Sequence, residues 1–389
     1  MDSNFSIDTI KLGLPVPFTR ERQVIFWDKV KHREFVNDPI NKGRRSIYVY
    51  LPKNWRQERL EKGIYTPKIW FQEDYLNTAA TTFYVEVSLP KLLHGHNAIE
   101  LKNDDLPLVV SKLQDLLKEL GIIVFARQIL DTFPSLVAFG KNIDITDIAY
   151  CDQVISVLAL FDDRFRSECH IIKPRGGGIE LYYNSRASTF KVYDKLAEMK
   201  NNAKTLEERK FVEAHSKQGY GQKEVWTCEL LRTELTLKGT DSIKKRLALF
   251  CDGKITFEKM FDEEISSRLL RNEVERIYCR PLSEFIFLST LQAPVIDDFL
   301  NKNVKHLGKK IMIKEMVSRI QNANGIKGVR KYYRQTYRSE QTFYNHSKLL
   351  NRLTREIDFS QFENNSAVKI HSYFLKQFGL DRSIQNKLF

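Results

Sequence analysis

CELLRTELTLK, residues 228–238, is the stretch that most clearly determines the fold of this chain. Its leucines alternate with polar residues that include Arg232 and Glu234. In an extended strand, this alternation places the leucines on one face and the polar side chains on the other. The pattern is typical of an antiparallel sheet that packs one face on a core and leaves the other face for a site.

Two other segments alternate in the same way. TTFYVEVS, residues 81–88, places Glu86 opposite an apolar face, and STFKVYDK, residues 188–195, places Tyr193 and Lys195 together on its polar side. Further strand-like runs occupy residues 46–51, 68–71, 142–151 and 179–184.

Helical patterns have a different distribution along the chain. Residues 105–121 have helical spacing, with Pro107 near the start and Gly121 at the end, where a cap belongs. After about Gly239 the strand signals stop and helical periodicity continues. We therefore expect an α+β fold: an antiparallel sheet with helices packed on it in residues 1–253, followed by an all-α, basic domain in residues 254–389.

The charge of the chain points to a polyanionic partner. Its net charge is +13, and residues 301–357 hold fourteen Lys and Arg residues against three acidic ones. Such a segment is suited to contact phosphates, and the release of counterions from DNA then supplies much of the affinity.

Other features exclude several classes of protein. No run approaches 18 apolar residues, and the N-terminal segment lacks the pattern of a secretory signal, so we expect a cytoplasmic protein that does not enter a membrane. The five cysteines form no CxxC pair, which argues against a zinc site or a disulfide framework.

The polar residues of these strands suit phosphodiester chemistry. A tyrosine hydroxyl is a nucleophile, carboxylates bind Mg²⁺ or Mn²⁺, and Lys or Arg can offset phosphate charge. Alternation alone favours Asp144 over Asp147 on the polar side of its run. The simpler alternative is that Tyr193 only packs in a strand and that Glu86 and Glu234 form ion pairs between strands.

Four segments occur in the order of a known family: VEVSLPKLLHGHN, DITDIAYC, YYNSRASTFKVYDKLAE and LLRTELTLK. Together they resemble the gene II/gene X replication initiators of filamentous phages. They are also similar to the plasmid initiators of the pT181 type. The resemblance covers roughly residues 7–240.

The resemblance implies roles for individual residues. The family nucleophile falls on Tyr193, with Lys195 two residues later, and the metal-binding acids fall on Glu86, Asp147 and Glu234. It thus favours Asp147 where alternation favours Asp144. Further candidates for the site or for DNA contact are His96, Arg186 and Arg232.

The resemblance also implies an HUH-like fold and an activity. A rolling-circle initiator nicks one strand at the origin through a 5′-phosphotyrosine link, leaves a free 3′-OH primer, and rejoins the strand at termination. Mg²⁺ or Mn²⁺ is the expected cofactor. The expected partners in a bacterial host cell are origin DNA, single-stranded at the nick, and a host helicase and DNA polymerase, since no helicase P-loop is present. A homodimer is left open.

Residues 325–355 are a helix-turn-helix candidate for binding duplex DNA. The predicted DNA contacts are Lys327, Arg330, Lys331, Arg334, Gln341, Asn345 and Lys348. The alternative is a basic helical bundle that contacts only the DNA backbone.

Two other functions are compatible with the sequence. One is a non-catalytic protein that binds or represses an origin, although such a protein needs no tyrosine beside acids on neighbouring strands. The other is a mobilisation relaxase or transposase that uses the same chemistry.

Overall fold

The computed structural model describes residues 5–15, 32–37, 45–50, 58–59, 61–72, 82–160, 168–172, 178–218, 224–251, 253–279, 288–322, 325–337, 341–345, 347–348 and 364–380. The chain divides into two compact units. The first comprises residues 1–144, 174–178 and 184–270, and the second comprises residues 145–173, 179–183 and 271–389.

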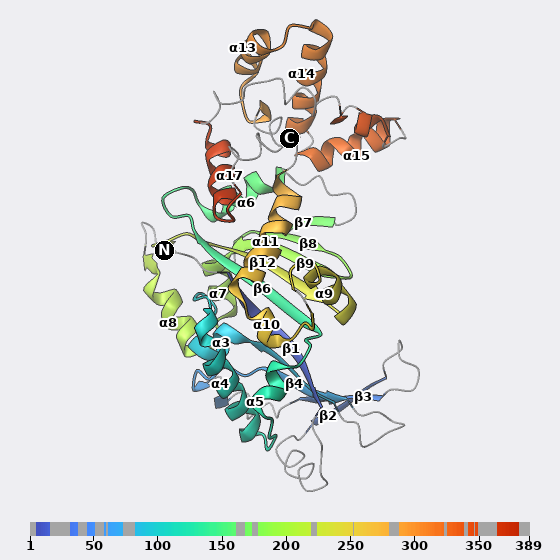
Figure 1. Ribbon diagram of the computed structural model, residues 1–389. Helices are drawn as coiled ribbons and strands as arrows, with labels where there is room; N and C mark the ends of the chain where they lie inside the picture. The colour runs from blue at the N-terminus through green and yellow to red at the C-terminus, as the bar shows by residue number, and fades with distance from the viewer. Residues whose placement is uncertain are drawn as a thin grey trace. The chain divides into compact units, whose positions relative to one another are not determined.

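The first unit is built on an antiparallel sheet (Figure 1). Its described strands follow the order β2-β3-β4-β5-β1-β6-β12-β9. Their bounds are β1 Ser6–Pro15, β2 His32–Asn37, β3 Arg45–Tyr50, β4 Lys68–Gln72, β5 Thr82–Ser88, β6 Leu136–Asp144, β9 Ser188–Asp194 and β12 Leu230–Lys238. A separate small hairpin joins β10 (Ser216–Gln218) and β11 (Glu224–Trp226).

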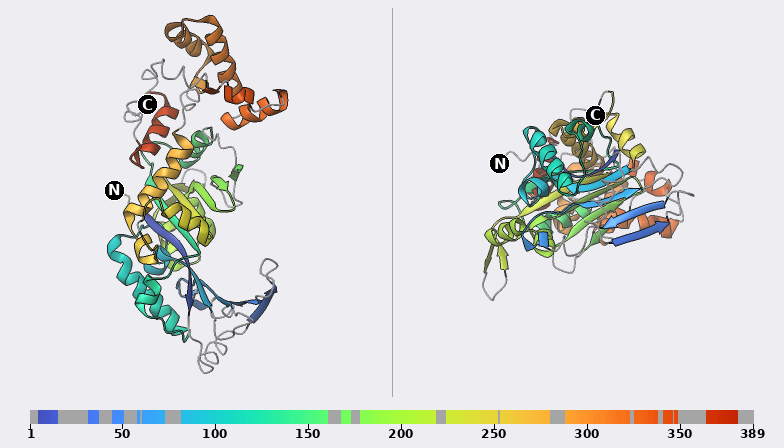
Figure 2. Two further views of the ribbon diagram at one scale, coloured as in Figure 1. Left: turned by 45° about the vertical axis from the view of Figure 1, so that its right-hand side comes forward. Right: turned by 90° about the horizontal axis from the view of Figure 1, so that it is seen from below.

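One face of this sheet forms the core, as the alternation of the sequence predicts. Val85 of β5 and Leu235 of β12 are fully buried, while their neighbours Glu86 and Glu234 are not. Helix α5 contacts β1, and helix α9 contacts β6 and β12. Figure 2 shows the same ribbon from two further directions. The helices of this unit are α3 Leu89–His94, α4 Leu106–Glu119, α5 Ala126–Leu130, α7 Lys195–Asn202, α8 Leu206–Ala214, α9 Thr240–Leu247, α10 Phe257–Met260 and the first half of α11 Glu263–Tyr278.

The described part of the second unit is mainly helical. Its core includes contacts between α6 (Cys151–Leu160) and α17 (Ser366–Lys376). The unit also contains α13 Ala293–Asn303, α14 Leu307–Asn322, α15 Ile326–Tyr337 and the strands β7 Glu168–Ile172 and β8 Glu180–Asn184. The predicted fold class, an antiparallel sheet with helices and a helical C-terminal region, is confirmed.

Two details of the sequence prediction are wrong. The strand expected at residues 142–151 lies earlier, as β6, and residues 146–148 form a turn before α6 begins. Strand β9 ends at Asp194, whose side chain accepts a hydrogen bond from the Ala197 amide at 3.0 Å and so caps α7. Because of this cap, Lys195 starts a helix and does not continue the alternation of the strand.

The predicted domain boundary at residue 253 stays a prediction. None of the described helices is long and apolar enough to cross a membrane.

Candidate active site

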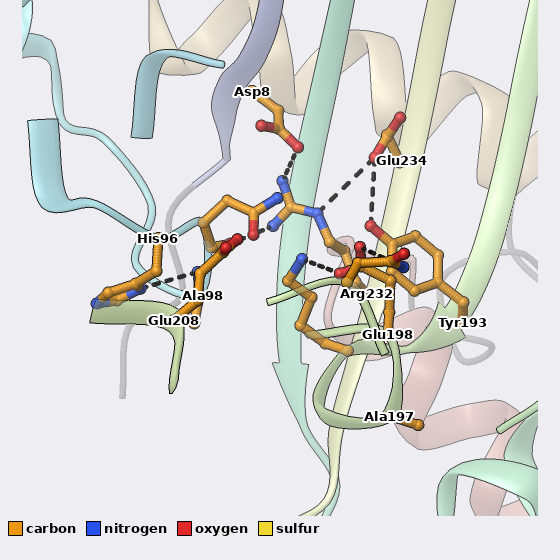
Figure 3. Close-up of polar contacts among 12 residues, drawn as sticks. Asp8, His96, Ala98, Tyr193, Ala197, Glu198, Glu208, Arg232 and Glu234 are labelled. Carbon is orange, nitrogen blue, oxygen red and sulfur yellow. Dashed lines mark hydrogen bonds and ion pairs between the residues drawn. The ribbon is translucent and has the colours of Figure 1, made fainter. Parts of the chain in front are cut away.

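A buried arginine organises the polar face of the first unit (Figure 3). Arg232 of β12 lies opposite Tyr193 of β9, and Glu234 lies opposite Lys191. Directly paired residues of antiparallel strands project to the same face, so these four side chains share one surface. The alternation of residues 228–238 predicted only that Arg232 and Glu234 share one side of their own strand.

Asp8 reaches the arginine because of a bulge in β1. The register between β1 and β6 shifts between Ile7 and Thr9, which leaves Asp8 as the extra residue. Its Oδ2 accepts a hydrogen bond from Arg232 Nη2 at 2.6 Å, and its Oδ1 accepts one from Ser88 Oγ at 3.0 Å. Both partners of the ion pair are almost completely buried.

The ion pair crosses β6 at a glycine. Gly140 lies between Glu234 of β12 and Ser6 of β1 in the paired strands. A Cβ atom at Gly140 would stand 2.5 Å from Arg232 Nη2 and 2.9 Å from Cζ. The missing side chain therefore provides the path by which the guanidinium reaches Asp8.

The loop after α3 covers the arginine from the other side. Arg232 Nη1 donates to Asn142 Oδ1 at 2.8 Å and to the Asn97 carbonyl at 3.2 Å. Asn142 in turn donates to the Ala98 carbonyl at 2.9 Å. Arg232 is only 1% exposed. Its guanidinium therefore positions the residues around it and does not face solvent.

Tyr193 and Glu234 complete this network, and of the two Tyr193 is buried while Glu234 is partly exposed. Tyr193 is 8% exposed, and its hydroxyl donates to Glu234 Oε2 at 3.4 Å. The other carboxylate oxygen, Oε1, accepts a hydrogen bond from Thr236 Oγ1 at 3.2 Å. Arg232 Nε lies 4.0 Å from Glu234 Oε2. Thr236 and Arg232 thus hold one oxygen of the carboxylate towards the tyrosine.

Lys195 lies beneath the tyrosine. Its side chain is fully buried, and Nζ donates to Glu198 Oε2 at 2.6 Å within the first turns of α7. Nζ also lies 5.8 Å from the centre of the Tyr193 ring. The YDK motif therefore consists of a strand end, a helix cap and a buried cation.

Burial controls the protonation of these groups. It raises the pKa of the Tyr193 hydroxyl well above 10, and the charge of Glu234 adds to that shift. Burial also raises the pKa of Glu234, and Asp8 adds to the rise while Arg232 opposes it. For Asp8, burial is outweighed by the charges of Arg232 and Lys195, which lower the pKa of that carboxyl.

Glu100 is a further acid next to the network. It accepts a hydrogen bond from the backbone amide of Asn142. Burial raises its pKa to about 7, although that hydrogen bond and the charge of Arg232 act in the opposite direction.

The predicted metal ligands do not gather in the described residues. Glu86 forms an ion pair with Lys68 at 2.6 Å, and strands β1 and β6 separate it from Glu234 on β12. Asp147 is exposed in the loop after β6 and belongs to the second unit. No group of three or more His, Cys, Asp or Glu side chains that could hold a metal ion occurs among the described residues.

Two further candidates are His96 and Arg186. His96 is buried, its Nδ1 accepts a hydrogen bond from the Ala98 amide at 3.3 Å, and its ring packs on Phe211. Arg186 is exposed in the turn between β8 and β9. The roles predicted for both stay predictions.

The predicted DNA-binding residues lie in the second unit. Lys331 and Arg334 are exposed on α15, and Arg330 donates to the Tyr344 hydroxyl at 2.7 Å. Gln341 donates to Asn345 at 3.1 Å, and Lys348 is exposed. The side chain of Lys327, residues 338–340 and 346, and the end of the helix-turn-helix candidate at 349–355 lie outside the described residues.

Comparison with protein families gives one match. Residues 36–258 match the Phage_CRI family, which is described as the N-terminal region of a replication-associated protein. The chain belongs to this family. The match covers more than half of the chain and includes the strands of the main sheet from β3 onward, together with Tyr193, Arg232 and Glu234. Neither the curated proteins nor the solved structures give a match.

Sequence reasoning missed several members of the site. Asp8 lies in SIDTIKLGLP, where nothing in the pattern marks a bulge. Asn142 and Gly140 lie in a strand whose bounds were misplaced. The glycine in the run LVAFGKNID was the available signal, because a glycine inside a strand often marks the close approach of another group.

Proposed function

We propose that this chain, a member of a replication-associated protein family, is a rolling-circle initiator that nicks one DNA strand with Tyr193. The observation that carries this proposal is the hydrogen bond from the Tyr193 hydroxyl to Glu234 Oε2, within a carboxylate arrangement held by Thr236 and Arg232. Any buried tyrosine hydroxyl needs a hydrogen-bond acceptor, but a carboxylate acceptor can also take up the proton of a nucleophile.

Glu234 is the group placed to receive the proton of the nucleophile. In the nicking step, Tyr193 Oη forms a bond to the phosphorus while its proton passes to Glu234, and the bond from phosphorus to the 3′ oxygen breaks. The departing 3′ oxygen takes a proton from water. On rejoining, the 3′ hydroxyl loses its proton to water as its oxygen bonds to the phosphorus, the bond from phosphorus to Tyr193 Oη breaks, and Glu234 returns its proton to the tyrosine oxygen.

Lys191 is a cation suited to the phosphate on this face. It is half-buried on β9, two residues before Tyr193, and its charge acts on Glu234. Arg232 and Lys195 are buried and engaged with Asp8 and Glu198. Their role in the proposal is to hold the tyrosine and its carboxylate in position.

Metal dependence is a separate part of the proposal. Glu86, Asp147 and Glu234 do not fit a single metal ion within the described residues, so no step above depends on such an ion. We retain Mg²⁺ or Mn²⁺ as a requirement to be tested by nicking in the presence of EDTA. Host helicase and polymerase would supply unwinding and synthesis from the free 3′-OH.

A nicking assay tests this function. The substrate is a supercoiled circle that carries the replication origin of this protein, and the product is an open circle with protein bound to one strand. Tyr193→Phe should abolish nicking, because only the hydroxyl is lost. Tyr182→Phe, at a half-buried tyrosine of β8, is the matched control and should nick normally. Full nicking by Tyr193→Phe would reject Tyr193 as the nucleophile and favour another one, whereas absence of nicking by the wild-type chain would favour a non-catalytic origin-binding protein.

A further inference from the structure

Two aromatic rings and two lysines lie on the sheet face that carries Tyr193, but at its far side. Trp70 of β4 stacks on Tyr84 of β5, with 5.5 Å between ring centres and 13° between ring planes. Both residues are half-buried. Lys11 Nζ of β1 lies 4.5 Å from the centre of the Trp70 ring and 5.4 Å from that of Tyr84.

A glycine allows the tyrosine ring to lie flat on the sheet. Gly13 of β1 is paired with Tyr84, and a Cβ atom at Gly13 would stand 2.8 Å from Tyr84 Cε1. The ring therefore covers the neighbouring strand and does not stand upright between other side chains. A flat aromatic surface beside cations suits stacking by a nucleobase whose phosphate the lysines attract.

The register shows that this aromatic pair and the nucleophile share one face. One row of paired residues crosses four strands: Glu86 of β5, Lys11 of β1, Leu136 of β6 and Lys238 of β12. Lys238 lies on the same side of β12 as Arg232, which is paired with Tyr193. From Tyr193 to Tyr84 the face spans roughly 30 Å, from strand spacing and rise. Single-stranded DNA sites commonly cover about 4–16 nucleotides.

The charge of this path favours a nucleic acid strand. The path from Tyr193 to Tyr84 carries four lysines and two carboxylates. The lysines are Lys191, Lys238, Lys11 and Lys68, and the carboxylates are those of Glu86 and Glu234. The side chain of Lys68 is 70% exposed. A polyanion is therefore the partner that this face attracts.

We propose that the Trp70–Tyr84 pair, with Lys11 and Lys68, is a base-stacking subsite for the single DNA strand whose phosphodiester reacts at Tyr193. The subsite rests on the proposed function for its connection to the nick, but its binding of single-stranded DNA can be measured separately. It engages a base several nucleotides from the cleaved bond.

The test measures binding of origin oligonucleotides to the full chain in a Tyr193→Phe background, which leaves the DNA intact. Trp70→Leu and Tyr84→Leu should each weaken single-strand binding about tenfold or more, as expected when a base loses its stacking partner. Trp70→Phe keeps an aromatic ring and should retain most of the affinity. Trp226→Leu is the matched control, because this half-buried tryptophan of β11 has Lys200 Nζ 5.9 Å from its ring but lies in the separate hairpin.

A scan with abasic nucleotides identifies the stacked base. One position of the oligonucleotide should weaken binding to the parent protein, and that loss should disappear in Trp70→Leu. Leucine variants that bind within twofold of the parent would overturn the subsite. The subsite would also be overturned if the same abasic positions weakened binding equally in the parent protein and in Trp70→Leu. If nicking by the wild-type chain fails while this coupling appears, the proposed function fails and the subsite stands.

Discussion

Gly140→Ala tests the buried network that supports Tyr193. The new methyl group would lie 2.5 Å from Arg232 Nη2, whereas ordinary van der Waals contact begins near 3.4 Å. The guanidinium would therefore have to move by about 1 Å. Such a movement would lengthen its 2.6 Å hydrogen bond to Asp8 beyond the range of a hydrogen bond.

The free-energy cost follows from these contacts. Loss of a hydrogen bond between charged groups costs about 1.5–3 kcal/mol, and overpacking of a core costs about 1–3 kcal/mol. These two costs add to about 2.5–6 kcal/mol, so we expect Gly140→Ala to lower the free energy of unfolding by about that amount. It should also slow nicking, because Arg232 helps to hold Glu234 beside the tyrosine.

Urea unfolding of the full chain measures the effect. Gly308→Ala is the matched control, because nothing lies within 4 Å of a Cβ atom at that position in α14. The stability of that variant should equal or slightly exceed that of wild type, since alanine has a higher helix propensity than glycine. A Gly140→Ala chain within about 0.5 kcal/mol of wild type, the range of ordinary surface substitutions, would refute the placement of Arg232 over Gly140.

Three further predictions concern protonation and DNA binding. Burial raises the pKa of Glu234, so the nicking rate should fall as the pH drops through a value above that of an ordinary carboxyl. Glu234→Gln should nick about 10²–10⁴-fold more slowly near pH 7 and recover as the pH rises towards the pKa of tyrosine; a flat pH–rate profile for this variant would contradict the role of proton acceptor. Burial raises the pKa of Glu100 to about 7 in the folded chain, so the wild type loses stability as the pH rises from the pKa of this carboxyl in the unfolded chain to about 7. Glu100→Gln should therefore be about 3 kcal/mol more stable than wild type at pH 8 and equal to it at pH 4. Equal melting temperatures of the two proteins at pH 8 would count against this. Alanine at both Lys331 and Arg334, which are exposed on α15, should weaken binding of origin and random duplex by similar factors and reduce the slope of log K against log salt by about 2, and an unchanged slope would show that these side chains do not contact phosphate.

The alternation of apolar and polar residues in strands β5, β9 and β12 could be recognised from the sequence. It placed Arg232 and Glu234 on one side of β12 and Tyr193 on the polar side of β9, because strand geometry fixes the side of each residue, but the pairing of the two strands came only from the structure. The resemblance to the phage initiators indicated the family, which the match over residues 36–258 confirms.

Other parts of the site depend on contacts between distant segments. Asp8 joins the site only through a bulge, which no local pattern of β1 indicates. The buried state of Arg232 depends on a loop about 135 residues earlier in the chain, because the Asn97 carbonyl accepts its hydrogen bond. Strand β6 was misplaced because the apolar residues of 143–148 resemble a strand, although residues 146–148 form a turn.

The residue that becomes attached to DNA identifies the nucleophile directly. Wild-type protein is allowed to nick a single-stranded origin oligonucleotide, the protein is digested with trypsin, and mass spectrometry locates the residue that carries the 5′ phosphate of the DNA. We expect a phosphodiester on Tyr193. Attachment to Tyr182, Tyr183 or any other residue, or complete nicking without a covalent product, would contradict it.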